Sequence, residues 1–312
     1  MQTHYKSGEP LFAIVEDAVG RVNTMTEGRL NIKLNPAGAI VPAGEEFQST
    51  NRGSIDAGEC SFSYVAGLSE AFSPFDGVAG GMTPVQFWLW LPWGGQEVIE
   101  DLCAKFLPDL QFVTSVPSLG EAFASSTKPI DTMDDFRKLK FRGTGDGTDI
   151  LAQMGVPTVF MPSSEIYESV QRGVIDAFES NTFYVNWSRG LNEVADYHYI
   201  SPARSPWGEN SFTVNKAKWA ELSPDLQQMV SSGFRDAWQT QVTLMMSVEG
   251  EYIQKFIDYG CTVETLPAAV EEEFMAEAEK YYAARRAADP DVDRVLSSMS
   301  AWQEICIQQR VR

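Results

Sequence analysis

The sequence has 312 residues, of which 44% are hydrophobic and 21% are charged. A chain of this length and composition buries a large core and divides into about two domains, which excludes disordered and small disulfide-rich proteins. The 43 acidic and 24 basic residues give a formal charge of −19, which repels polyanions and excludes nucleic-acid binding. The sequence contains no run of 18 apolar residues, so we expect no membrane span.

Histidine and cysteine are too sparse to suggest common catalytic sites. The only two histidines are His4 and His198, which leaves little from which to build a histidine metal site or a Ser-His-Asp triad. We expect His198, between two tyrosines, to be a packed strand residue. The cysteines are far apart in sequence and form no CxxC motif, so two disulfides and four free thiols both stay open. They are Cys60, Cys103, Cys261 and Cys306.

The first elements follow from hydrophobic spacing. Apolar residues at positions 12, 15, 19 and 22 share one helical face, and Gly28 is a plausible end for that helix. Leu30, Ile32 and Leu34 then alternate with polar residues, which predicts a half-buried strand ending at Pro36.

An internal repeat is the most informative feature of the sequence. Residues 47–65 and 167–185 match at a constant offset of 120, with identical Ser, Arg, Gly, Ile, Asp, Ala, Glu, Tyr and Val. Each copy predicts a helix, a glycine stop after arginine, and a strand that begins at Ile-Asp-Ala. Because repeats of this kind determine architecture, we expect two similar α/β halves.

The rest of the chain supplies further helices and strands. Residues 138–142 and 211–215 read as strands, and residues 226–258 have helical periodicity without proline. Short helices are expected near residues 134–136, 150–152 and 218–222, and a longer acidic helix over residues 267–288.

Arg142 is the leading candidate for a ligand-binding residue. It ends a predicted strand, and ligands of open α/β sheets bind outside the carboxyl ends of strands. Its planar guanidinium suits a carboxylate, although a surface arginine paired with Asp146 or Asp149 is an equal alternative. The glycines that follow have GxGxG spacing, which argues against a dinucleotide and favours a small anion at the helix N-terminus.

A second strand end supplies further candidates. Glu179, Ser180 and Asn181 follow the strand of the second repeat, and Glu179 is a structural carboxylate, a metal ligand or an acid–base group. Glu121 lies at the approach to the second half. Two carboxylates beside one bound anion need a cation between them. Trp207, between Pro206 and Gly208, is expected to form a pocket wall.

These motifs together resemble the substrate-binding proteins of TRAP transporters, the periplasmic DctP-type receptors. The matching segments keep the family order over nearly the whole chain. They are residues 28–32, 52–57, 128–142, 173–179 and 212–224. Within the family, the sequence resembles the branch that binds 2-oxo and 2-hydroxy monocarboxylates with a bridging cation.

The resemblance implies a fold and a domain division. The fold is α/β, a two-lobed, type II-like periplasmic binding protein whose two similar α/β domains are joined by crossing strands and a long helix. Lobe I is expected to comprise residues 1–116 and 207–250. Lobe II is expected to comprise residues 117–206 and 251–312, with the C-terminal helices.

The resemblance also implies roles for individual residues. Arg142 corresponds to the carboxylate clamp of the family, and Glu179 with the backbone of Ser180 corresponds to the cation ligands. Glu121 stands where the branch often has glutamine, and Tyr64 where an aromatic closes over the ligand. Ser180 replaces a tryptophan of the oxo-acid branch. We therefore expect a Ca²⁺ or Na⁺ ion with the ligand, held by Glu179, Glu121 and Ser180.

The expected function is that of a periplasmic solute receptor that delivers a small organic acid to membrane permease subunits. The alternative is an enzyme that acts on a hydroxy or acyl acid with a carboxylate base. A homodimer is an open alternative to a monomer. The family begins with an export signal and a first strand, and we expect both to be absent from the sequence as given.

Overall fold

The strands form two separate sheets. The computed structural model describes residues 1–311, and we call the parts built around the two sheets lobe I and lobe II. The lobe I sheet has the order β1-β2-β9-β3 and the lobe II sheet the order β10-β8-β4-β7-β5-β6. The strands of lobe I are β1 (Gln2–Thr3), β2 (Ala57–Cys60), β3 (Leu110–Leu119) and β9 (Trp207–Asn215). Those of lobe II are β4 (Ala124–Ser126), β5 (Phe141–Arg142), β6 (Thr158–Val159), β7 (Ala177–Phe178), β8 (Tyr197–Ile200) and β10 (Thr262–Thr265).

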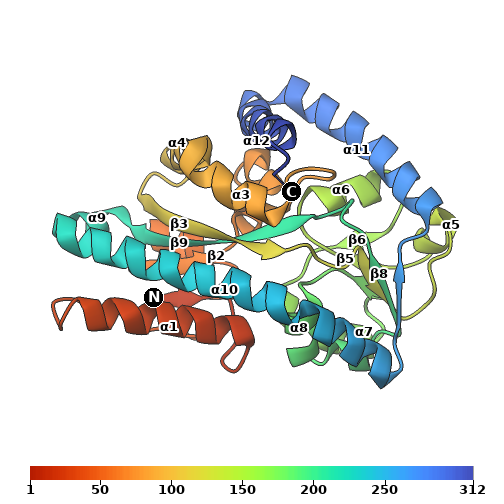
Figure 1. Ribbon diagram of the computed structural model, residues 1–312, viewed down its shortest axis with the longest axis horizontal. Coiled ribbons are helices and arrows are strands. Elements are labelled where there is room, and N and C mark those ends of the chain that lie inside the picture. The colour runs from red at the N-terminus through yellow and green to blue at the C-terminus, as the bar shows by residue number, and fades with distance from the viewer. Residues whose placement is uncertain (312) are drawn as a thin grey trace.

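Two long strands and one long helix connect the lobes. Strands β3 and β9 pair antiparallel from Leu110↔Asn215 to Leu119↔Trp207, and the chain enters and leaves lobe II at their far end. Helix α10 (Pro224–Tyr259) packs against α1 (Pro10–Met25) and β3, and then against α8 (Phe183–Ser188). It therefore runs along both lobes (Figure 1).

The predicted repeat is confirmed as a repeated structural unit. Helix α2 (Glu46–Asn51) leads to β2, and helix α7 (Ile166–Gln171) leads to β7. Each helix is followed by a glycine in the left-handed region, Gly53 with φ 73° and Gly173 with φ 68°. This conformation strains residues with a side chain, which explains why both copies carry glycine there.

The C-terminal helices divide between the lobes. Helix α11 (Ala268–Ala288) buries Phe274 and Ala278 in the core of lobe II. Helix α12 (Pro290–Gln308) instead packs against α3 (Pro84–Trp90) and α4 (Gln96–Phe106) of lobe I. Its apolar residues Val292, Val295 and Leu296 lie on one helical face and join the core of lobe I. The assignment of all residues after 250 to lobe II is therefore wrong for α12.

The remaining predicted elements agree with the structure except for two strands. A first strand before α1 was expected to be absent from the sequence, but β1 is present and pairs in parallel with β2. The helices α5 (Met133–Phe136), α6 (Gly145–Gln153) and α9 (Lys216–Ala220) lie close to their expected positions. Residues 30–34 were expected to form a strand, but they have no strand structure. The N-terminus contacts this region through a hydrogen bond from Met1 N to the main-chain oxygen of Lys33 and, just after the segment, through the isolated bridge between Gln2 and Asn35.

The structure also tests the expectations about His198 and the cysteines. His198 packs edge-on against Phe256 at 4.7 Å between ring centroids and is buried, as expected for a strand residue. Within residues 1–311 the four cysteines are buried free thiols. None of the helices there is long and apolar enough to cross a membrane.

Candidate functional site

A polar cavity lies between the lobes. Lobe I contributes residues from the ends of β1, β2, β3 and β9, and lobe II contributes residues that follow β5 and β7. The cavity has a volume of about 50 Å³, so it is suited to a ligand of a few non-hydrogen atoms. It is lined by His4, Ser61, Ser63, Tyr64, Asp76, Ser118, Glu121, Arg142, Thr144, Ser163, Ser180, Asn181, Arg189, Gly208, Glu209 and Asn210.

Arg142 is held rigidly by two of its guanidinium nitrogens, and the third is free to bind a ligand. Phe141 is buried in the core of lobe II, and β5 pairs in parallel with β6 and β7, so Arg142 lies at the carboxyl end of an interior strand of the sheet. Its Nε donates to the main-chain oxygen of Met161 at 2.9 Å, and Nη1 donates to Glu179. Among residues 1–311, Nη2 has no recorded partner. The guanidinium is thus oriented in advance for an anion in the cavity.

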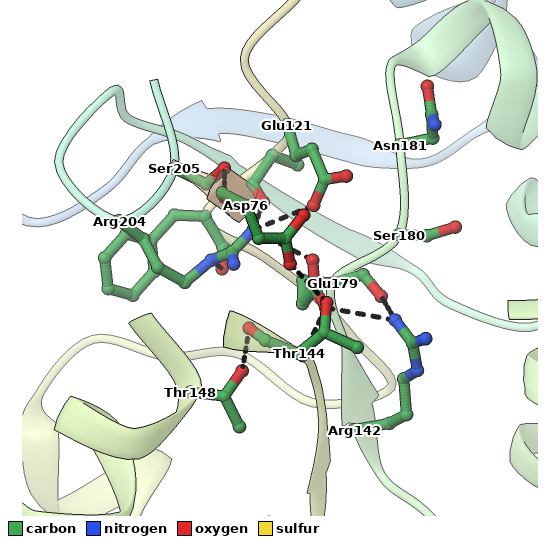
Figure 2. A network of polar contacts seen from close by, with 12 residues as sticks. Asp76, Glu121, Arg142, Thr144, Thr148, Glu179, Ser180, Asn181, Arg204 and Ser205 are labelled. Atoms are coloured by element: carbon green, nitrogen blue, oxygen red, sulfur yellow. Dashed lines mark hydrogen bonds and ion pairs between the residues drawn. The ribbon is translucent and has the colours of Figure 1, made fainter. Parts of the chain in front are cut away.

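Glu179 is the centre of a buried network (Figure 2). Its Oε1 accepts hydrogen bonds from the main-chain nitrogen of Thr144 at 2.7 Å and from Arg142 Nη1 at 3.0 Å, and its Oε2 lies 3.3 Å from Arg204 Nη2. Burial alone would raise the pKa of this carboxyl, but Arg204, a hydrogen bond from Glu121 and Arg142 together lower it to about 2. Glu179 is therefore ionised at neutral pH.

Arg204 joins the two carboxyl groups that the sequence had suggested as metal ligands. Its Nη2 lies 3.1 Å from Glu121 Oε2 as well as 3.3 Å from Glu179 Oε2. Its Nε donates to the main-chain oxygen of Phe123 at 3.0 Å, and only 2% of its surface is exposed. Burial and the neighbouring Glu179 raise the pKa of Glu121 well above its usual value. The positive charge between these two carboxyls is thus a guanidinium.

Lobe I adds two further acids that sequence reasoning missed. Asp76 ends the 3₁₀ helix Glu70–Asp76, and its Oδ2 accepts a hydrogen bond from Thr144 Oγ1 at 2.5 Å. Burial and Glu179 raise the pKa of Asp76 to about 7. Glu209 accepts hydrogen bonds from Phe62 N and Ser211 Oγ, and burial raises its pKa to about 7. The lobe I wall is therefore acidic.

Arg189 connects the lobes at the side of the cavity. Its Nε and Nη2 donate to Glu9 Oε2 at 3.1 and 2.7 Å, and its Nη1 donates to Ser180 Oγ at 3.2 Å. Glu9 precedes α1 in lobe I, whereas Arg189 follows α8 in lobe II. The ring of Tyr64 contacts Phe160 edge-on at 5.9 Å, a second contact between the lobes. Sequence alone offered no signal for the pairing of Arg189 with Glu9, which are 180 positions apart.

The structure gathers six of the seven predicted ligand-binding residues around the cavity. They are Arg142, Glu179, Ser180, Asn181, Tyr64 and Glu121, of which Glu179 lies directly behind the wall. Trp207 departs from the prediction. It is fully buried and stacks on Phe87 at 4.0 Å between centroids, and the next three residues of β9 reach the cavity instead.

The predicted ion position is already occupied by a side chain. Carboxylate oxygens suit Ca²⁺ and Na⁺, but Arg204 Nη2 stands between Glu121 and Glu179. No group of three or more His, Cys, Asp or Glu side chains in residues 1–311 is arranged to hold a metal. These residues do not fit an ion shared by Glu121 and Glu179. The assignment of Ser180 as a third ligand stays a prediction.

Comparisons with known proteins agree with this architecture. A monocarboxylate 2-oxoacid-binding periplasmic protein of Nostoc sp. is 27% identical over 262 residues, covering 83% of this chain and 71% of the relative. The structure of a TRAP periplasmic solute-binding protein from Colwellia psychrerythraea with bound calcium and pyruvate superposes with a TM-score of 0.91 at 21% identity. The alignment covers 99% of this chain and 94% of that chain.

A similar protein from Pseudoalteromonas atlantica with bound sodium and pyruvate has a TM-score of 0.90 at 23% identity, with the same coverage of 99% and 94%. These neighbours confirm the two-lobed α/β fold, and they contain the two kinds of ion expected from the resemblance. The model of the bacterial extracellular solute-binding proteins of family 7, DctP, matches residues 1–288. The chain therefore belongs to the DctP family of TRAP transporter solute-binding proteins.

Proposed function

We propose that this chain is a periplasmic receptor that binds a small organic acid through Arg142 and delivers it to the permease of a TRAP transporter. The observation that carries the proposal is the guanidinium of Arg142, which is fixed on two sides and directs Nη2 to an interlobe cavity. A carboxylate there would gain charge-assisted hydrogen bonds without any cost of ordering the arginine.

The named function of the Nostoc relative supports 2-oxo and 2-hydroxy monocarboxylates as the first ligands to test. The small size of the cavity agrees with this choice. Lobe closure would then enclose the acid, because residues of both lobes line the cavity.

The enzyme alternative is less well supported. Glu179 is the best buried carboxylate, but its oxygens are bound by two guanidiniums and Thr144, and its pKa of about 2 makes it a weak base. Recovery of the ligand unchanged after long incubation with the protein would agree with a receptor, and turnover would contradict it.

The direct test is ligand binding by variants of Arg142. Calorimetry with pyruvate, lactate and related acids should give binding to the wild type. Arg142→Ala should weaken it by about 2–5 kcal/mol, because the ligand carboxylate loses its partner in a closed site. Arg142→Lys keeps the charge without the planar fork and should bind with intermediate affinity.

Arg172→Ala is the control, because the side chain of Arg172 is 73% exposed. Circular dichroism should verify that each variant is folded. Wild-type affinity in folded Arg142→Ala would contradict the proposal.

A further inference from the structure

The cavity and its immediate surroundings contain more acids than bases. Three guanidiniums belong to it, from Arg142, Arg189 and Arg204. Five carboxyl groups accompany them, from Glu9, Asp76, Glu121, Glu179 and Glu209. Because His4 is paired with Glu59 at 3.2 Å, it does not offset this excess. The pKa of Glu121 is raised well above its usual value and those of Asp76 and Glu209 to about 7, so these three acids are wholly or partly protonated in the absence of a further cation.

Asp76 is the acid with the fewest donors. Thr144 has one hydroxyl hydrogen, but its Oγ1 lies 2.5 Å from Asp76 Oδ2 and 2.9 Å from Glu179 Oε1. That hydrogen serves only one of the two carboxyls at a time. Among residues 1–311, Asp76 Oδ1 has no recorded donor, whereas Glu179 is bound by both Arg142 and Arg204. Asp76 therefore offers acceptor capacity to a ligand.

Two unfilled groups of opposite sign thus face one small cavity. Arg142 Nη2 is a free hydrogen-bond donor in the lobe II wall. The carboxyl of Asp76, in the lobe I wall, has fewer hydrogen-bond donors than it can accept. We propose that the ligand is a small amino acid, whose carboxylate binds Arg142 and whose ammonium group binds Asp76. This inference rests on the proposed function and specifies the polar group that accompanies the carboxylate.

An ammonium group matches the lobe I wall better than a hydroxyl or keto oxygen. It brings a positive charge and three donors, whereas a hydroxyl brings one donor and no charge and a keto oxygen brings only an acceptor. Burial and, after it, the neighbouring Glu179 raise the pKa of Asp76 to about 7, and a bound cation offsets the cost of ionising this carboxyl. Arg204 lies within 3.3 Å of both Glu121 and Glu179, whereas no cationic side chain of residues 1–311 forms an ion pair with Asp76.

The lining also limits the rest of the ligand. Of the side chains that the structure places around the cavity, none is aliphatic, and Tyr64 is the main apolar surface. A branched or long hydrocarbon portion would find no matching wall. The amino acid should therefore be short.

The test uses matched pairs of ligands that differ only in the amino group. Ligand-free wild-type protein is titrated by calorimetry with L-alanine and L-lactate, β-alanine and 3-hydroxypropionate, and 4-aminobutyrate and 4-hydroxybutyrate. Pyruvate is included as the oxo acid. We expect one amino acid to bind at least about tenfold more tightly than its hydroxy analogue and than pyruvate.

The Asp76→Asn variant then tests the partner of the ammonium group. It should reduce the preference for the amino acid by about tenfold or more and leave the hydroxy analogue nearly unaffected, because the amide keeps the shape and loses the charge. Asp56→Asn, at an exposed position outside the cavity, is the control and should change neither affinity.

The outcomes separate the two proposals. Wild-type protein that binds a hydroxy or oxo acid as tightly as the amino acids overturns the amino-acid inference and leaves the receptor function intact. An unchanged preference in folded Asp76→Asn also overturns it. Failure of every carboxylate to bind ligand-free protein would overturn the proposed function itself.

Discussion

Arg142 Nη1 lies 2.9 Å from the main-chain oxygen of Glu179 and 3.0 Å from Oε1 of the same residue. The pairing follows from topology, because β5 and β7 are parallel neighbours and their carboxyl ends meet at one edge of the lobe II sheet. Glu179 therefore positions the proposed anchor and, through Oε2, also offsets the charge of Arg204. A ligand enters a site whose cations are already oriented.

Replacing Glu179 by glutamine should destabilise the protein. The two buried guanidiniums of Arg142 and Arg204 would lose their shared carboxylate, and breaking buried pairs of this kind costs about 3–5 kcal/mol. Chemical denaturation of Glu179→Gln at neutral pH should show a loss of this order. A loss below about 1 kcal/mol would mean that Glu179 contributes little to the network.

The lowered pKa of Glu179 predicts that part of the stability of the fold is lost in acid. Its pKa is about 2 in the fold and near 4.5 in an unfolded chain, so it stabilises the fold above pH 4.5 and this contribution is lost as the pH falls toward 2. The free energy of unfolding of Glu179→Gln should accordingly depend less on pH in this window than that of the wild type. Glu45→Gln, in an exposed ion pair, is the control.

The ion pair of Glu9 with Arg189 should favour the closed arrangement of the lobes. Both side chains are 10% exposed, and the pair spans the lobes beside the ligand cavity. Glu9→Gln should weaken ligand binding by about 5–30-fold, corresponding to 1–2 kcal/mol, mainly through faster dissociation. Stopped-flow displacement measures this rate. Unchanged dissociation would show that the contact forms without stabilising closure.

The control for this pair is Arg52–Glu45, an ion pair of exposed side chains within lobe I at 3.5 Å. Glu45→Gln should leave both affinity and dissociation rate unchanged, since exposed pairs contribute little. Small-angle scattering of ligand-free Glu9→Gln should also give a larger radius of gyration than the wild type if the pair holds the lobes together.

Local patterns predicted those parts of the fold and site that depend on short segments. The repeat placed Glu179 at a strand end because the Ile-Asp-Ala segment determines a helix-to-strand unit within about 20 residues. Arg142 was found by the same strand-end rule. Both predictions concern residues whose surroundings are formed by parallel strands of one sheet, so spacing along the chain was enough to indicate their positions.

Residues positioned by contacts between distant segments could not be assigned in the same way. Asp76 meets Thr144, and Arg204 meets Glu121, through pairings that span 68 and 83 positions. The available sequence signal for Arg204 was its position in the short segment through which the chain returns to lobe I. Trp207 was misplaced because its indole packs into the core of lobe I on Phe87, a contact with a distant segment that the flanking turn residues do not reveal.

His198 predicts a second contribution to acid unfolding at higher pH. Burial, opposed by a hydrogen bond with Ala195, lowers its pKa from 6.5 to about 4. Between these values the unfolded state binds the extra proton, so stability falls as the pH decreases from 6.5 to 4, by as much as about 3 kcal/mol. Replacement by a residue that does not titrate should flatten this part of the stability profile.

His198→Gln provides this test, with denaturant unfolding measured at several pH values. The variant should be less stable at pH 7, because the contact with Phe256 is lost, but its stability should change less between pH 6.5 and 4. Ser125→Ala, which removes the hydroxyl 2.8 Å from Nδ1 and keeps the imidazole, should retain the slope. A wild-type slope in His198→Gln would assign this titration to other groups.

Arg204 predicts how the site responds to metal ions. Because its guanidinium stands between Glu121 and Glu179, we expect the affinity for the ligand to be unchanged by chelators and by added Ca²⁺ or Na⁺.

In Arg204→Gln the two carboxyl groups lose this cation, and Ca²⁺ with its preference for hard oxygens should take its place. Added Ca²⁺ alone should then raise the melting temperature of Arg204→Gln and leave that of the wild type unchanged. Magnesium, which is smaller and holds its water more strongly, should have little effect on either protein. Loss of wild-type affinity on chelation would show that an ion binds with the ligand despite Arg204, and this measurement decides the question even if Arg204→Gln does not fold.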